Sequence, residues 1–465
     1  MSLLALSSAA LAAPFKPVGK ISLVSRGADA NILTDNLCET TPGVTERRGY
    51  CTFSFHHRNP DIYADRRTVV TVNDDVHLWF WYFSARNSPT TAPLVTWLNG
   101  GPGASSMIGL FQNNGPCTFV NGTTPVFNPY SFNNNVNMLY IDQPAGTGFS
   151  YGSDAATKMI NSTQLAIPYV YEFLQAFLQH EEFAALQGKK VGVAGASYVG
   201  HYGPELVRYI QERNADSPAV AVQLAGLAVN DGMFDYRIQE PAMADYMLEK
   251  GLVDQATYDS VMADYKRDCA PALDACDEKG GDAVCSAADD SCYNVVEGPL
   301  TDLLDYPYDI RGLGYVPPSY YMQWFGLVKE KLGNETAYIS SSNAIFNRFI
   351  GTGDTARSFI PRLSEFVSTG VPTLLWVGDQ DMLCNYIGVR RVAEAIEYAG
   401  QAAFKSRSLE EWAPSGGTSY GLFKTEGSLS YLQVYRAGHN LQFGQPEAGL
   451  KAFNQFFLNG TLSIA

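Results

Sequence analysis

Residues 190–200 read Lys-Val-Gly-Val-Ala-Gly-Ala-Ser-Tyr-Val-Gly, and they decide the fold. The run 190–194 predicts a buried strand, and a helical pattern is under way by Glu205. Small residues on either side of the serine allow a tight turn that exposes the Oγ atom of Ser197. In the G-x-S-x-G pattern of such turns the second glycine comes one residue earlier than Gly200 does here. The stretch therefore predicts a nucleophilic serine, with a plain glycine turn as the alternative.

Apolar, β-rich runs recur on both sides of this turn and alternate with helical patterns. The expected strands are 76–83, 93–98, 136–142, 190–194, 223–229, 371–377 and 431–436, and the expected helices are 164–186, 205–213 and 388–399. Runs this apolar suit strands buried on both faces, so the alternation predicts a largely parallel sheet with helices on both faces. Together with the serine turn, this pattern is typical of an α/β-hydrolase fold.

The alternation stops between about 232 and 370, where four cysteines cluster. Since strands resume after the break, we interpret 233–370 as an inserted cap over the edge of the sheet, with 14–232 and 371–465 as the core. The alternative is a separate domain downstream of the first part of the sheet.

The composition is that of a compact soluble protein, and the N-terminal segment suggests export. Of its 465 residues 46% are hydrophobic and 17% charged, with a net charge of −15, which argues against disorder and against nucleic acid as a partner. Residues 1–13 predict a signal-like segment, a frayed apolar terminus being the alternative. No other stretch approaches the ~18 apolar residues of a transmembrane helix. In an exported chain the candidate glycosylation sites are Asn121, Asn161, Asn334 and Asn459.

Eight cysteines also fit an oxidising compartment. Cys269, Cys276, Cys285 and Cys292 lie 7, 9 and 7 residues apart, too far for the close pairs of a zinc site, so no metal is expected. The symmetric spacing suits two nested disulfides, Cys269–Cys292 around Cys276–Cys285, although spacing alone does not fix the pairing.

The partners of Ser197 follow from the order of residues in the chain. In this fold the acid and then the histidine base come after the serine. Of six histidines, four precede Ser197 and His201 lies too close to it, which leaves His439, just after the last expected strand. Two aspartates, Asp379 and Asp381, directly follow another expected strand, and spacing does not choose between them.

An oxyanion hole needs two backbone N–H donors near the nucleophile. One belongs to the residue after the serine, here Tyr198, and the other to a loop after an earlier strand. Asn99-Gly100-Gly101-Pro102-Gly103 follows the expected strand 93–98, and we assign the second donor to Gly101. A simple turn is the alternative for this glycine-rich loop.

Taken together, these residues resemble the serine carboxypeptidase family, and its secreted fungal branch most closely. The matching stretches, in family order, are 97–103, 114–117, 141–144, 148–151, 197–198 with 200–204, 378–385 and 437–439. The resemblance implies that Asp381 is the catalytic acid, that Asp379 is structural and that no cofactor is needed. It also implies a third disulfide, Cys38–Cys117, and a free buried thiol at Cys384, and it leaves Cys51 unassigned.

Two positions depart from the family pattern. The family usually has one glutamate directly before the nucleophile and another before Asn-Gly-Pro, and these acids bind the C-terminal carboxylate of the substrate. Here the two positions hold Ala196 and Asn113, whereas Asn99 and Gly100, which help to bind that carboxylate, are kept.

The resemblance implies a secreted or vacuolar serine hydrolase that forms an acyl-enzyme, most simply a carboxypeptidase acting on peptides. Because of Ala196 and Asn113, the alternative is an acyltransferase, or an esterase or amidase, that acts on a small metabolite. A non-catalytic binding protein is a third reading, against which the triad argues. Neither nucleic acid nor a membrane is an expected partner, and the oligomeric state is left open.

Overall fold

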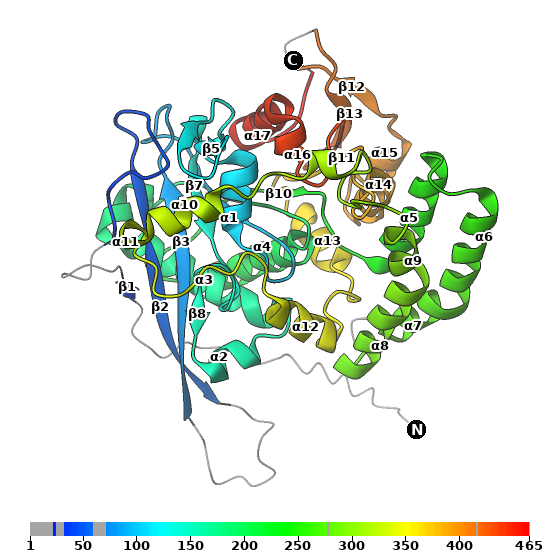
Figure 1. Ribbon diagram of the computed structural model, residues 1–465, viewed down its shortest axis with the longest axis horizontal. Coiled ribbons are helices and arrows are strands. Elements are labelled where there is room, and N and C mark those ends of the chain that lie inside the picture. The colour runs from blue at the N-terminus through cyan, green and yellow to red at the C-terminus, as the bar shows by residue number, and fades with distance from the viewer. Residues whose placement is uncertain (1–21, 25–31, 59–70, 277–279, 415–416, 465) are drawn as a thin grey trace, which may run out of the picture.

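A twelve-stranded sheet runs through the centre of the computed structural model (Figure 1). The structure describes the chain except for residues 1–21, 25–31, 59–70, 277–279, 415–416 and 465. The expected signal-like segment 1–13 therefore lies outside the described residues. The strand order is β1-β2-β3-β7-β4-β9-β10-β11-β14-β13-β12, and β8 pairs with β3.

The middle of the sheet is parallel, which confirms the expectation. Its strands are β7 (Asn137–Ile141), β4 (Leu94–Leu98), β9 (Val191–Ala196), β10 (Leu224–Asn230), β11 (Thr373–Gly378) and β14 (Leu429–Val434). Side chains alternate between two cores: Leu94 and Leu98 lie in one, Val95 and Trp97 in the other. A strand buried on both faces is apolar throughout, and this makes it easy to recognise in the sequence.

Antiparallel strands extend the sheet at both edges. One edge holds β1 (Ser22–Val24), β2 (Glu46–Arg58), β3 (Thr71–Phe83) and β8 (Tyr151–Gly152), and the other holds β13 (Gly421–Glu426) and β12 (Glu410–Trp412). A small separate sheet pairs β5 (Cys117–Phe119) with β6 (Pro125–Phe127). The sequence did not predict β2, in which Glu46 and Arg48 are fully buried because each finds hydrogen-bond partners there.

Helices cover both faces of the sheet. One core includes residues of α3 (Thr163–Gln179), α4 (Val199–Ala215), α13 (Ile360–Ser368) and α14 (Tyr386–Ala395). The other includes residues of α1 (Ser106–Ile108), α10 (Tyr321–Leu327), α16 (Leu441–Gly444) and α17 (Pro446–Asn459). Phe453 of α17 stacks on Phe132 with ring centroids 3.8 Å apart. Two short helices, α2 (Asp154–Met159) and α15 (Gln401–Ser406), lie in connecting segments.

The long segment 231–372 leaves the sheet after β10 and returns to its parallel neighbour β11. Its remaining helices are α5 (Tyr236–Glu249), α6 (Gln255–Asp264), α7 (Ala270–Cys276), α8 (Asp282–Cys292), α9 (Gly298–Thr301), α11 (Lys329–Leu332) and α12 (Asn343–Thr352). Figure 1 shows α5 to α9 gathered at one side, whereas the part with α10 and α11 crosses in front of the sheet towards β2 and β3. There Trp324 stacks on Trp81.

Three disulfides hold loop-rich parts of the chain. Cys269 bonds to Cys292 around the inner pair Cys276–Cys285, and Cys38 bonds to Cys117. Cys51 and Cys384 are free and buried.

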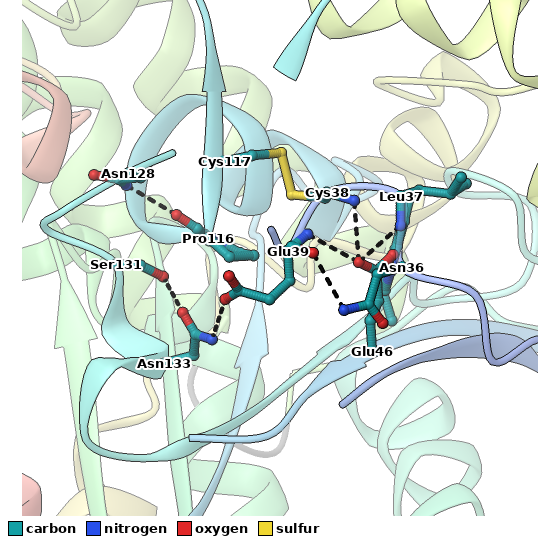
Figure 2. The surroundings of a disulfide bond; sticks show 12 residues. Asn36, Leu37, Cys38, Glu39, Glu46, Pro116, Cys117, Asn128, Ser131 and Asn133 are labelled. Carbon is teal, nitrogen blue, oxygen red and sulfur yellow. Dashed lines mark hydrogen bonds between the residues drawn. A yellow bond between two sulfur atoms is a disulfide. The ribbon is translucent and has the colours of Figure 1, made fainter. Parts of the chain in front are cut away.

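The Cys38–Cys117 bond joins two segments that also share a polar network (Figure 2). The Oε2 atom of Glu46 accepts hydrogen bonds of 2.9–3.0 Å from the backbone N–H groups of residues 37, 38 and 39. The Nδ2 atom of Asn133 donates to Glu39 Oε2 at 2.8 Å. The disulfide and this network hold Cys117 in place. Cys117 lies four residues after Asn113, which stands at one of the two positions that depart from the family pattern.

The four candidate glycosylation sites differ in exposure. Asn121 and Asn459 are exposed, and Asn161 and Asn334 are half-buried. Among the described residues, no helix combines the length and the apolar character needed to cross a membrane.

Candidate active site

Ser197 lies in a strained turn between β9 and α4. Its φ is +64°, in the left-handed region that most side chains avoid. Its N–H donates to Asn230 O at 2.9 Å, and its carbonyl accepts from Gly200 N at 2.9 Å and Met233 N at 3.0 Å. A Cβ atom at Gly200 would collide with the backbone of Met233, so this close approach explains why the second glycine stands at 200.

The loop 99–103 lies directly against this turn. A Cβ atom at Gly100 would overlap the backbone N of Tyr198 and approach the Cβ of Ser197. Gly101 has a φ of +108°, which only glycine adopts without strain. Asn99 is held by its Oδ1, which accepts from Trp97 Nε1 at 2.8 Å and Gly109 N at 3.2 Å. The two segments that we expect to supply oxyanion donors are therefore neighbours.

His439 and Asp381 are joined by a short hydrogen bond, 2.6 Å between Nδ1 and Oδ2. Asp381 has a fully buried side chain, whereas 12% of the His439 side chain is exposed. The other oxygen of Asp381 accepts from Leu383 N at 3.0 Å and Cys384 N at 3.3 Å. Asp379 instead accepts from Gln380 Nε2 at 2.9 Å. Of the two aspartates left open by spacing, Asp381 is the one that contacts the histidine.

Asn230, at the end of β10, connects the serine turn to the histidine loop. Its carbonyl accepts from Ser197 N, and its Nδ2 donates to His439 O at 3.1 Å and to Asp231 Oδ2 at 2.6 Å. Asn230 and Asp231 were not predicted from the sequence, although they lie where β10 ends, and β10 pairs with β11, the strand that precedes Asp381.

Tyr198, the residue after the serine, is anchored through its side chain. Burial raises the pKa of Tyr198 well above its usual value, so the hydroxyl keeps its proton and donates to Asp354 Oδ2 at 2.6 Å. The same oxygen accepts from Thr163 N at 3.0 Å and Thr163 Oγ1 at 2.6 Å. The Tyr198 ring stacks on His201, whose ring is fully buried and whose Nδ1 lies 2.7 Å from Met233 O. His201 is therefore a packing residue rather than a base.

The two positions that depart from the family pattern are both buried and close to the site. Ala196 immediately precedes Ser197, and Asn113 Nδ2 donates to Asn440 Oδ1, beside His439, at 3.2 Å. Among the described residues, Asn113 Oδ1 has no hydrogen-bond partner. The structure thus places the Asn113 amide, whose oxygen has no partner among the described residues, against the residue that follows His439.

One group of side chains has the spacing of a metal site, with atoms of Asp381, Cys384 and His439 within 4.8 Å of one another. Burial raises the pKa of the Cys384 thiol well above its usual value, so the sulfur stays protonated. Asp381 and His439 already bond to each other. The group is better suited to hydrogen bonding than to binding an ion.

Comparison with known proteins identifies the family. The family model described as serine carboxypeptidase matches residues 65–459. The chain belongs to the serine carboxypeptidase family. Carboxypeptidase S1 of Penicillium janthinellum is 40% identical over 447 residues, which cover 93% of this chain and 99% of that protein. A vacuolar serine-type carboxypeptidase of Saccharomyces cerevisiae is 31% identical over 404 residues, covering 82% and 77%.

The fold is also that of a solved carboxypeptidase. A prohormone-processing carboxypeptidase from Saccharomyces cerevisiae has a TM-score of 0.74 and 20% identity, covering 91% of this chain and 93% of that one. The comparisons confirm the expected family, the α/β-hydrolase fold and the activity: the protein is a serine-type carboxypeptidase, and the acyltransferase or esterase alternative is not favoured.

Proposed function

We propose that Ser197, His439 and Asp381 form the catalytic triad of this carboxypeptidase. The observation that carries the proposal is the 2.6 Å bond between His439 Nδ1 and Asp381 Oδ2, on a loop that Asn230 ties to the Ser197 turn. Because Nδ1 faces the carboxylate, Nε2 is the nitrogen available to take the serine proton.

The reaction then follows the acyl-enzyme route. Ser197 Oγ attacks the last peptide carbonyl and passes its proton to His439, which gives it to the departing amino group as the C–N bond breaks. A water molecule repeats the attack on the ester, with His439 as base, and releases the shortened peptide. Asp381 keeps its negative charge and stabilises the imidazolium that forms in each half of the reaction.

The backbone N–H groups of Tyr198 and Gly101 would stabilise the oxyanion. Their segments lie in contact, since a Cβ atom at Gly100 would overlap the backbone N of Tyr198, and Ser197 and Gly101 both have positive φ values. Each such donor is typically worth ~10²–10³-fold in rate.

Asn99, Gly100 and Asn113 would bind the C-terminal end of the peptide. Asn113 donates a hydrogen bond to Asn440, the residue that follows His439 in the chain. An amide donates a hydrogen bond to a carboxylate at any pH, and its free oxygen can accept one from a C-terminal carboxamide. We therefore expect a weaker preference for the free carboxylate than paired acids would give.

Residues 233–370 would act as the cap that shapes the substrate site, and the partner would be a peptide rather than nucleic acid or a membrane. The net charge of −15 disfavours nucleic acid. Three disulfides and the vacuolar relative from Saccharomyces cerevisiae agree with passage through the secretory pathway, as a secreted or vacuolar enzyme. There Asn121, Asn161, Asn334 and Asn459 would be glycosylation sites.

The test compares blocked dipeptides with their C-terminal amides and with a panel of acyl acceptors, using wild type and Ser197→Ala. A fluorophosphonate should label the wild type on Ser197 and leave the variant unlabelled. Hydrolysis of blocked dipeptides by the variant at the wild-type rate would refute the triad.

A further inference from the structure

The loop that carries Asn99 and Gly101 leaves the sheet beside the end of β7. β4 and β7 are parallel neighbours, and Trp97 of β4 pairs with Tyr140 of β7. Two residues further on, Asn99 and Asp142 therefore leave the sheet at the same edge. The far end of the loop reaches α1, which begins at Ser106.

The hydroxyl of Ser106 fastens the start of this loop. It accepts a hydrogen bond from Asn99 N at 3.0 Å and donates one to Ile141 O at 2.5 Å. The Ser106 side chain is buried. A single hydroxyl group thus bridges the first residue of the loop and the last residue of β7.

Asp142 holds Ser106 in turn. Its Oδ1 accepts hydrogen bonds from Ser106 N at 2.9 Å and from Ser105 Oγ at 2.7 Å, and its Oδ2 accepts one from Phe149 N at 3.0 Å. The backbone N of Asp142 donates to Trp79 O of β3 at 3.0 Å. Asp142 is fully buried and tied to the sheet, so the start of α1 has a fixed position.

The chain just after Ser106 orients the side chain of Asn99. Gly109 N donates to Asn99 Oδ1, and a Cβ atom at Gly109 would overlap both this oxygen and Trp97 Nε1. Because Oδ1 already accepts two hydrogen bonds, from Trp97 and Gly109, the Nδ2 donor is the group left to face a substrate. Ser106 thus fixes the backbone of Asn99, and Gly109 fixes its side chain.

We propose that Ser106 is a positioning residue of this active site, whose hydroxyl fixes the place of Asn99 and, along the same loop, of Gly101. The inference rests on the proposed function, in which Asn99 binds the C-terminal carboxylate and the Gly101 N–H stabilises the oxyanion. The two groups are two residues apart, so a shift of the Asn99 backbone displaces both. Loss of the Ser106 hydroxyl should weaken carboxylate binding and oxyanion stabilisation together, which a loss of stability alone would not do in folded enzyme.

The first experiment measures kcat and KM of wild type and Ser106→Ala on blocked dipeptides and on their C-terminal amides. The variant should lose about 10²-fold in kcat, the effect of a displacement of about 1 Å, and its preference for the free carboxylate should fall. Ser84→Ala is the matched control, because Ser84 Oγ is also buried and accepts a backbone N–H, that of Thr45, at 2.8 Å. This control should keep the wild-type kcat and the wild-type preference.

The second experiment measures the inhibition constant of a blocked amino aldehyde. The adduct that it forms with Ser197 places an oxygen where the oxyanion develops and has no C-terminal carboxylate. Its affinity therefore reports on the Gly101 donor without the Asn99 contact. Ser106→Ala should raise the inhibition constant by about the same factor by which it lowers kcat, and Ser84→Ala should leave it unchanged.

Urea denaturation shows that each variant is folded under the assay conditions. If Ser106→Ala does not fold, Ser105→Ala replaces it. That variant removes one donor to Asp142 and keeps the Ser106 hydroxyl, so kcat, the preference and the inhibition constant should change in the same direction by a smaller factor. Unchanged values in the folded variant, or equal changes in Ser84→Ala, would overturn the proposal.

Asn99→Ala separates this inference from the proposed function. A wild-type preference for the free carboxylate in Asn99→Ala would show that the carboxylate site itself is wrongly assigned, and the positioning role would fail with it. A lowered preference in Asn99→Ala beside an unchanged one in Ser106→Ala would refute the positioning role alone. Lowered preferences in both variants, with weaker aldehyde binding in Ser106→Ala, would support it.

Discussion

Tyr198 Oη donates a 2.6 Å hydrogen bond to Asp354 Oδ2, and this bond joins the residue after Ser197 to the far end of the segment 231–372. Asp354 lies between α12 and α13, and its carboxylate also accepts the N–H and hydroxyl of Thr163. Asp354, which lies outside the core strands, therefore helps to hold the Ser197 turn in position.

Asp354→Ala should destabilise the protein strongly, because three buried donors lose their acceptor at once. At ~1–3 kcal/mol for each buried unpaired group, the free energy of unfolding should fall by about 3 kcal/mol or more. Tyr198→Phe removes a single hydroxyl and should cost about 1 kcal/mol. Urea denaturation measures both, and equal losses in the two variants would contradict the role given to Asp354.

The triad variants Ser197→Ala, His439→Ala and Asp381→Asn should each lower kcat by about 10³-fold or more, and their effects should not add. Asp379→Asn should act mainly on stability, because Asp379 bonds to Gln380 rather than to His439. Steady-state kinetics on folded protein check this. The assignment of the acid is wrong if Asp379→Asn removes turnover while Asp381→Asn keeps it.

In denatured, unreduced protein two thiols should titrate, those of Cys51 and Cys384. In the native state both should react slowly, because burial raises the pKa of each thiol well above its usual value. Reduction should loosen residues 269–292 first, since each bridge there is typically worth ~2–4 kcal/mol. Peptide mapping should recover Cys269 with Cys292, and a fragment joining Cys269 to Cys276 would refute the pairing.

The altered carboxylate site predicts an unusual pH profile. Two adjacent acids bind a carboxylate only when at least one is protonated, so binding by such a pair favours acid. With Asn113 and Ala196 this effect is absent, so kcat/KM should rise from acid towards neutrality. Asn113→Glu combined with Ala196→Glu should move the optimum to lower pH and sharpen the preference for a free C-terminus. A wild type most active near pH 4 that rejects amides strongly would show that another group binds the carboxylate.

Stability should fall as pH rises, because three carboxyls meet inside the insertion. Burial raises the pKa of Glu297 to about 7, that of Asp289 to about 6 and that of Glu240 further. In the unfolded chain such groups titrate near ~4, so the folded state holds more protons between about pH 4 and 7. The contribution is complete below that window and is lost as pH rises through it.

Glu240→Gln tests this dependence. Neither carboxylate oxygen of Glu240 has a hydrogen-bond partner among the described residues, so a neutral amide should relieve the repulsion. Urea denaturation at pH 4.5 and 7.5 should show a smaller difference for the variant than for the wild type. Glu330→Gln, exposed in α11, should behave like the wild type. An unchanged difference in Glu240→Gln would show that the cluster does not control stability.

The central sheet could be predicted from the sequence because each middle strand is buried on both faces. The expected 93–98 and 190–194 correspond to Leu94–Leu98 and Val191–Ala196. The helix expected at 205–213 begins earlier, at Val199. The prediction began too late because Gly200 and Gly203 are typical of a turn, whereas Gly200 is needed here for close packing against Met233. The strand β2 was not predicted because Glu46 and Arg48 make it look exposed, whereas partners such as Trp81 and the Lys331 carbonyl, distant in the chain, satisfy these charges in the core.

The site was partly predictable for a similar reason. Chain order alone was enough to select His439, but only geometry separates Asp381 from Asp379 without help from the family. Asn230 and Asp231 carry no motif of their own. Their roles depend on the pairing of β10 with β11, which no short stretch of sequence specifies.

Thr163 belongs both to the Asp354 network and to the triplet Asn161-Ser162-Thr163. In the folded protein it is fully buried and its hydroxyl is engaged with Asp354. A glycosyltransferase that reads this hydroxyl can reach it only before α3 settles against the insertion. The fold therefore sets an order of events for any glycosylation of Asn161: the sugar would have to be attached before α3 packs, and a molecule that folds first would keep that asparagine unmodified.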